Sequence, residues 1–101
     1  MRVAAGTQED VELKAFAGSR LNVDWEVLEG RDIDFGITMV PDDDTQGPIT
    51  IYGPSRRSTK LATSIPINMN GTIHMGFDTS YTWISSKLIR YSACVVHGEV
   101  C

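Results

Sequence analysis

The chain has 101 residues, a formal net charge of −4, 42% hydrophobic residues and 22% charged residues. A chain of this length builds one hydrophobic core, and its composition is ordinary for a globular protein, so we expect one folded domain and exclude disorder of the whole chain. The deficit of Lys and Arg argues against a dedicated nucleic-acid binder, because phosphate binding needs clustered positive charge.

The two ends of the sequence bear on its compartment. The first residues lack an apolar h-region, and no stretch approaches ~20 apolar residues, so we expect neither a signal peptide nor a membrane span. Cys94 falls in a strand pattern, and a bridge to Cys101 would have to fold the end of the chain back on that strand. We therefore expect both thiols to be free, which favours a reducing, cytoplasmic compartment.

Alternation of apolar and polar residues, typical of half-buried strands, begins near Val11 after a flexible leader over residues 1–9. It is cleanest from Leu21 to Val27, where it places Trp25 on the buried face. A turn at residues 29–31 and a further alternating run at 33–39 predict a hairpin of these two strands.

A polar loop follows at residues 41–47. Its three aspartates, 42–44, lack the spacing of a calcium loop and indicate a solvated loop. The next strand, at 49–51, is predicted to end at Gly53-Pro54, and residues 55–64 fit a strand or an extended loop equally well. Asn70-Gly71 then predicts a type I′ hairpin between strands at 65–69 and 73–77.

The last third consists of two alternating runs, 73–77 and 89–95, around the polar corner Asp78-Thr79-Ser80. Seven or eight short strands with regular turn signals predict an all-β fold, an antiparallel β-sandwich. We place the domain at residues 10–97 and a C-terminal tail at 98–101.

Two blocks of the sequence resemble the GOLD domain, and together the resemblance covers residues 11–96. The block "FDTSYTWISSKLIRY" supplies the matching residues Phe77, Asp78, Ser80, Tyr81, Ser86, Lys87, Ile89 and Tyr91. The block "AGSRLNVDWEVLEGRDIDFGITM" supplies Gly18, Leu21, Trp25, Asp32, Ile33, Phe35, Gly36 and Ile37. Thr79 departs from the usual Asn, and Ile73 stands where a Tyr is frequent.

The resemblance implies a sandwich of jelly-roll type and a non-enzymatic adaptor without cofactors. It implies protein partners in the Golgi or secretory pathway, and an association with lipid transfer, since such domains often accompany Sec14-type domains. Luminal members, the p24-type cargo receptors, have a signal peptide, a disulfide and a transmembrane helix. We therefore expect a cytoplasmic location, peripheral at Golgi or other endomembranes.

Five residues are candidates for binding a partner or a lipid. Arg56, Arg57 and Lys60 form the one cationic cluster of the sequence, which could bind anionic lipid head groups or an acidic partner, or be an ordinary basic surface. Trp83 lies in the polar corner and could anchor a partner or cap one end of the core. Tyr81 is expected to pack against the end of the sandwich.

No catalytic motif accompanies His74 or His97, and both are expected to be exposed and polar. Asp32 and Asp34 share the solvent face of one strand, where we expect no cleft for acid–base work. We therefore expect no enzyme and no metal site. Two alternative functions remain open: binding of anionic lipids through residues 55–60, and a carbohydrate-binding jelly roll that stacks a sugar on Trp83 or Tyr81.

Overall fold

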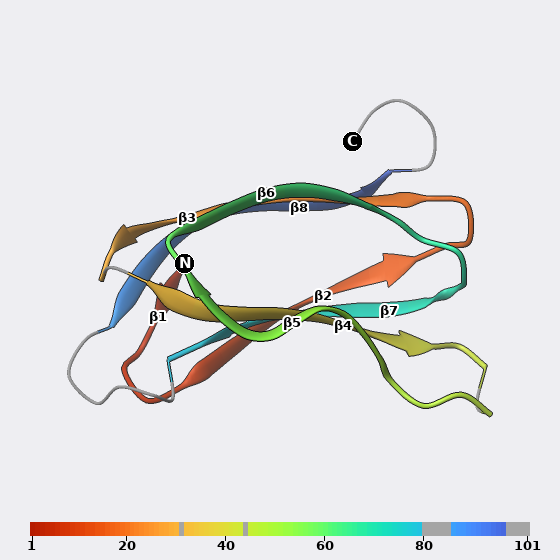
Figure 1. Cartoon of the computed structure of the whole chain (residues 1–101), viewed down its shortest axis with the longest axis horizontal. Coiled ribbons are helices and arrows are strands. Elements are labelled where there is room, and N and C mark those ends of the chain that lie inside the picture. Colours follow the sequence, from red (N-terminus) through yellow and green to blue (C-terminus); the bar gives the residue numbers. More distant parts are fainter. Residues whose placement is uncertain (31, 44, 80–85, 97–101) are drawn as a thin grey trace.

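The computed structural model of the chain describes residues 1–30, 32–43, 45–79 and 86–96, except for the side chains of 54–58. The described residues form eight strands in two antiparallel sheets that face each other as a sandwich (Figure 1). The prediction of an all-β antiparallel sandwich is confirmed. Within the described part, no helix is long and apolar enough to cross a membrane.

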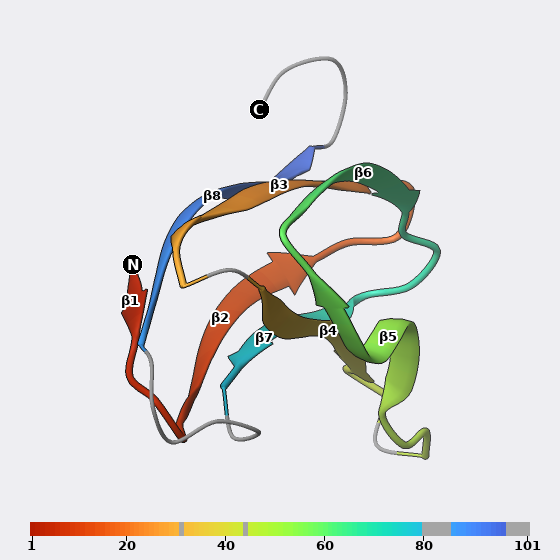
Figure 2. The ribbon, with the colours of Figure 1, turned by 60° about the vertical axis from the view of Figure 1, so that its left-hand side comes forward.

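Each sheet has four strands. The first, which we call the β8 sheet, has the order β1 (Arg2–Val3), β8 (Lys87–Val96), β3 (Arg20–Glu29) and β6 (Lys60–Pro66). The second, which we call the β7 sheet, has the order β2 (Gln8–Ala15), β7 (Gly71–Asp78), β4 (Ile33–Pro41) and β5 (Ile49–Ser58). Figure 2 shows β1 and β8 on the same flank of the sandwich as β2, with β5 and β6 on the opposite flank.

The core lies between the sheets, because alternate side chains of β3, β4 and β7 point inward. Trp25, Phe35 and Phe77 are each at most 1% exposed, and their ring centroids lie 4.9 to 5.7 Å apart. The prediction that Trp25 is buried is confirmed. Tyr91 joins this aromatic cluster from β8, with its ring centroid 6.0 Å from that of Phe77.

The predicted hairpin of residues 21–27 with 33–39 is wrong. These runs are β3 and β4, and they belong to different sheets, so the chain crosses the sandwich between them. Gly30 makes the crossing with a φ of 107°, and its carbonyl accepts a hydrogen bond from the buried ammonium of Lys87. Alternation reveals which side chains are buried, but it does not reveal which strand lies alongside.

The hairpin predicted at Asn70-Gly71 is also wrong, because β6 and β7 lie in different sheets. Gly71 does not have the positive φ that a type I′ turn requires. It is buried in register with Pro41, and an added Cβ would lie 2.6 Å from the Val40 carbonyl oxygen. Asn70 instead bridges loops, since its Oδ1 accepts a hydrogen bond from the Ala17 N–H.

The first nine residues, expected as a flexible leader, contain β1 and the start of β2. The Met1 ammonium donates to the Ile89 carbonyl at 2.8 Å, and the Ile89 N–H donates to the Met1 carbonyl at 2.7 Å. Val3 is fully buried in the core. Apolar Met1 and Val3 thus tie the start of the chain to the edge of β8.

Thr79 fixes the connection between β1 and β2. Its side chain is fully buried, and its N–H donates to the Thr7 carbonyl at 2.8 Å. Its hydroxyl lies 2.6 Å from the Ala4 carbonyl oxygen and accepts a hydrogen bond from the Thr7 N–H at 3.1 Å. One hydroxyl therefore satisfies backbone groups of a turn more than seventy residues away in sequence.

Replacing that hydroxyl by a methyl group in Thr79→Val is expected to lower the free energy of unfolding by about 1–3 kcal/mol, because buried backbone groups lose their partner. Thr79→Ser keeps the hydroxyl and serves as the control. Urea denaturation followed by circular dichroism measures both. Equal stability of Thr79→Val and the wild type would show that these hydrogen bonds do not stabilise the turn.

Candidate functional site

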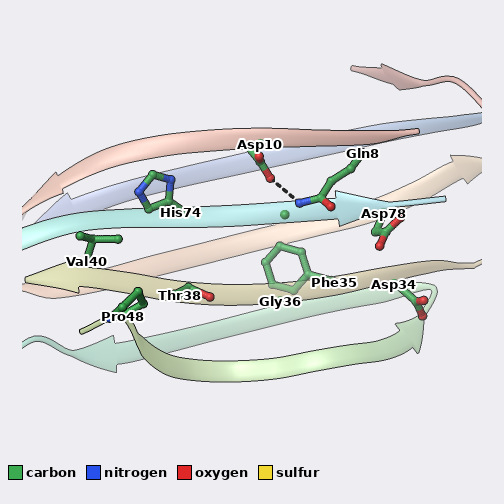
Figure 3. Close-up of a pocket in the computed structure, with 11 residues that line it drawn as sticks. Gln8, Asp10, Asp34, Phe35, Gly36, Thr38, Val40, Pro48, His74 and Asp78 are labelled. Atoms are coloured by element: carbon green, nitrogen blue, oxygen red, sulfur yellow. Dashed lines mark hydrogen bonds between the residues drawn. The ribbon is translucent and has the colours of Figure 1, made fainter. Parts of the chain in front are cut away.

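A shallow, open groove of about 480 Å³ crosses the outer face of the β7 sheet (Figure 3). Gly36 of β4 is paired in register with Gly76 of β7, so two adjacent strands lack a side chain at the same level and their backbone forms the floor. The walls are formed by side chains from β2, β4 and β7 and from the residue before β5: Gln8, Asp10, Asp34, Thr38, Val40, Pro48, His74 and Asp78.

A hydrogen bond along β2 lies beside Gly76 on one wall of the groove (Figure 3). Gln8 Nε2 donates to Asp10 Oδ1 at 2.8 Å, and Asp10 is the register partner of Gly76 on β2. A Cβ at position 76 would lie 3.0 Å from Gln8 Nε2 and 3.2 Å from Asp10 Oδ1. Glycine at this position therefore leaves room for the Gln8–Asp10 pair.

The two ends of the groove differ in chemistry. At one end Asp34 and Asp78 are directly opposite each other in register, and together with Asp10 they supply carboxylate oxygens. At the other end His74 Nδ1 lies 3.4 Å from Glu12 Oε1. Among the described residues, no group of three or more His, Cys, Asp or Glu side chains is arranged to hold a metal ion. The floor is backbone that is already hydrogen-bonded within the sheet, so the side chains of the walls are the groups that could contact a ligand.

Of the five predicted binding residues, Lys60 is the one whose side chain the structure describes, and it does not line this groove. Arg56 and Arg57 lie in β5, which continues through the predicted break at Gly53-Pro54 and is paired there with Phe35 and Asp34 in an irregular register. Lys60 is the first residue of β6, in the other sheet. Tyr81 and Trp83 lie outside the described residues. In register, Arg57 has the carboxylate-bearing Asp34 as its neighbour.

The aspartate run at 42–44 forms local contacts. Asp42 Oδ2 accepts a hydrogen bond from Lys14 Nζ at 2.8 Å. The backbone N–H and hydroxyl of Thr45 donate to Asp43 Oδ1, and these hydrogen bonds lower the pKa of the Asp43 carboxyl. Asp44 lies outside the described residues. Asp42 and Asp43 are thus engaged with neighbouring side chains and backbone, as in an ordinary surface loop.

The acid–base candidates fall partly at the groove. His74 is on the outer face of β7, where its side chain is 34% exposed beside Glu12, whereas His97 lies outside the described residues. Asp34 points outward as predicted, and it lines the shallow groove on that face. Asp32 precedes β4 and does not line it.

The prediction of a free thiol at Cys94 is wrong, because Cys94 is disulfide-bonded. Cys101, the other cysteine of the sequence, lies outside the described residues. We expected free thiols because a bridge would have to fold the end of the chain back on its strand. Closeness to the end of the chain in sequence therefore did not predict the state of this thiol.

The groove itself was missed by sequence reasoning. Gly36 entered only as a residue of the GOLD-like pattern, and Gly76 only as a small residue between Met75 and Phe77. The signal that could have revealed the groove is their pairing across β4 and β7, but that pairing depends on a sheet order that the sequence does not contain. No protein-family model matches this sequence, and no curated protein matches it either.

Proposed function

We propose that this chain is a non-enzymatic, protein-binding module of the GOLD type, an adaptor in Golgi or secretory traffic or in lipid transfer. The observation that carries the proposal is the meeting of the two GOLD-like blocks in the core. Trp25 and Phe35 of one block pack against Phe77 of the other, and Tyr91 of that block packs on Phe77. Residues that must fit together in one core are the residues that a shared fold would keep.

The surface supports a polypeptide as the ligand. The groove over Gly36 and Gly76 is open and combines polar side chains with apolar ones such as Val40, a surface that can accept an extended segment through side-chain contacts. Binding of a partner usually depends on a few central contacts, so one well-placed substitution at the groove should remove most of the affinity. Thr38, half-buried on the wall of the groove, is such a position.

The test is affinity capture from a secretory-pathway extract with the immobilised chain, quantified by mass spectrometry. Thr38→Arg places a long cationic side chain in the groove, and Ala62→Arg places the same side chain on the exposed outer face of β6, in the opposite sheet. We expect a defined set of partner proteins to be retained by the wild type and Ala62→Arg and to be lost at least ~10-fold with Thr38→Arg, equal to about 1.4 kcal/mol. Trp83→Ala, run beside them, assigns or removes the anchoring role of that side chain.

Sedimentation with anionic and neutral vesicles at low and physiological salt separates the lipid alternative. Salt-sensitive binding that Arg56→Ala with Arg57→Ala abolishes, together with no retained protein, would contradict the adaptor proposal and favour direct lipid binding. The carboxylate neighbour of Arg57 in register is unfavourable for an anionic lipid at that position. We therefore expect no vesicle binding by the chain alone.

We propose a cytoplasmic location, as expected from the sequence. The redox state of Cys94 in cells tests this location. A disulfide such as the one at Cys94 forms and persists in oxidising compartments. Thiol labelling before and after reduction distinguishes the cases. A free thiol would favour the cytoplasmic side, whereas protection until reduction would favour a luminal or extracellular one.

A further inference from the structure

The β8 sheet has an open edge on the flank that it shares with β2. β1 is only two residues long and pairs with Leu88 and Lys87, and Met1 adds one pair with Ile89. In the described part of the chain, no strand pairs with this side of β8 over the remaining residues, 90–96. We call this side of residues 90–96 the free edge of β8; the name refers to backbone pairing, and Cys94 within it is disulfide-bonded.

The direction of the backbone groups along the free edge follows from antiparallel geometry. The N–H and C=O of Ile89 point toward β1, and those of every second residue point the same way. The N–H and C=O groups of Tyr91, Ala93 and Val95 therefore lie in the plane of the sheet and point away from β3, toward the open edge. The intervening residues of β8 bond to β3.

The other strand edges carry features that discourage pairing with a second chain. β2 has four charged residues among eight, including the core-side Glu9. β5 contains Gly53 and Pro54 and shifts its register against β4. β6 begins with Lys60 and ends with Pro66. The free edge of β8, in contrast, reads RYSACVV, with a single charge and no proline.

Three side chains on the core side of the free edge, those of Tyr91, Ala93 and Val95, are incompletely covered. Tyr91 is 40% exposed although its ring packs on Phe77, and Ala93 and Val95 are half-buried against the core. On the same flank, Val11 and Leu13 of β2 are also only half-buried. These side chains are thus only partly covered by the described residues, and an additional strand beside β8 would cover more of them.

We propose that the free edge of β8 pairs with the free edge of a second copy of this chain, antiparallel, with the two-fold axis at Ala93. This register places Tyr91 opposite Val95 of the second copy and joins both β8 sheets into one continuous sheet. The inference rests on the proposed function as a protein-binding module and names one partner, a second copy of the chain. Each dimer would then carry two of the grooves over Gly36 and Gly76.

Self-complementarity favours a second copy over an unrelated strand. The free edge is centred on Ala93, begins after the last residue paired with the N-terminal strand and ends where β8 ends. The smallest side chain falls on the axis, and the flanking pair joins an aromatic to a β-branched residue, which is a favourable cross-strand combination. The one charge, Arg90, is already paired with Asp24 at 2.9 Å on its own sheet.

Sedimentation velocity across a wide concentration range tests the proposal. We expect the mass to rise from 11.1 kDa to twice that value, with a monomer in denaturing, non-reducing electrophoresis that excludes a covalent link. Ala93→Lys and Ala93→Glu each place like charges opposite each other at the axis, so each variant alone should remain monomeric. Their equimolar mixture should regain the dimer, because Lys then faces Glu.

Ala62→Lys, on the exposed outer face of β6, is the matched control and should dimerise like the wild type. A wild-type chain that stays monomeric at every concentration would overturn the proposal, as would a dimer that neither Ala93 variant disrupts. If the wild type is monomeric and Ala93→Lys loses a captured partner, the edge holds a different polypeptide, and the proposed function stands without the second copy. Loss of every captured protein would instead contradict the proposed function, whatever the mass.

Discussion

Truncation of Trp25 to alanine is expected to lower the free energy of unfolding by about 3–5 kcal/mol, which is a large part of the ~5–15 kcal/mol typical of a domain. The side chain is 1% exposed, and its ring centroid lies 5.1 Å from that of Phe35 and 5.7 Å from that of Phe77. Its removal leaves a cavity where both sheets meet. Urea denaturation followed by circular dichroism measures the loss.

Trp25→Phe is the matched control. The indole Nε1 is buried and, among the described residues, has no hydrogen-bond partner. Phenylalanine removes that unsatisfied donor and keeps an aromatic ring against Phe35 and Phe77, so we expect a loss below about 1.5 kcal/mol. A Trp25→Phe variant as unstable as Trp25→Ala would mean that the indole has a partner that stabilises the fold.

The second large effect is expected for Gly71→Ala. The added Cβ would lie 2.6 Å from the Val40 carbonyl oxygen and 3.1 Å from Pro41 Cα, both of them backbone atoms that cannot move aside like a side chain. We expect the free energy of unfolding to fall by about 3 kcal/mol, at the upper end of the effect of overpacking. Thermal and urea denaturation measure it.

Gly47→Ala provides the comparison for Gly71→Ala. No atom lies within 4 Å of an added Cβ at position 47. The substitution should therefore leave the free energy of unfolding unchanged or raise it by up to ~1 kcal/mol, because alanine lowers the conformational entropy of the unfolded chain. If Gly47→Ala lowers the free energy of unfolding as much as Gly71→Ala does, the conformational freedom of glycine, and not a steric clash, would explain both effects. A negligible loss at Gly71 would contradict the close approach of β7 to the end of β4.

The inward faces of the strands were predictable from the sequence, because burial on one face of a sheet imposes a period of two. Trp25, Phe35 and Phe77 each lie in an alternating run, and each is buried. The partners of the strands were not predictable in the same way. A strand has the same alternation whether its neighbour in sequence lies beside it or faces it across the core, and both predicted hairpins failed for that reason.

The candidate site depended almost entirely on this missing information. Gly36 and Gly76 make a groove only because β4 and β7 are paired, and Tyr91 lies at an edge of β8 beyond the residues that pair with β1. The disulfide at Cys94 likewise depends on the path of the chain in space. Local sequence patterns do not predict the order of strands in a sheet, so they do not predict features that depend on that order.

Amide hydrogen exchange along β8, followed residue by residue by NMR at low and at high protein concentration, tests most directly that a second copy of this chain binds at the free edge of β8. In the dilute protein, the amides of Tyr91, Ala93 and Val95 should exchange rapidly, while those of Arg90, Ser92 and Cys94 are protected by β3. At high concentration the first three should become protected too. Equal protection of all six in the dilute protein would show that the edge is already covered, and rapid exchange of the first three at every concentration would show that no second copy binds there.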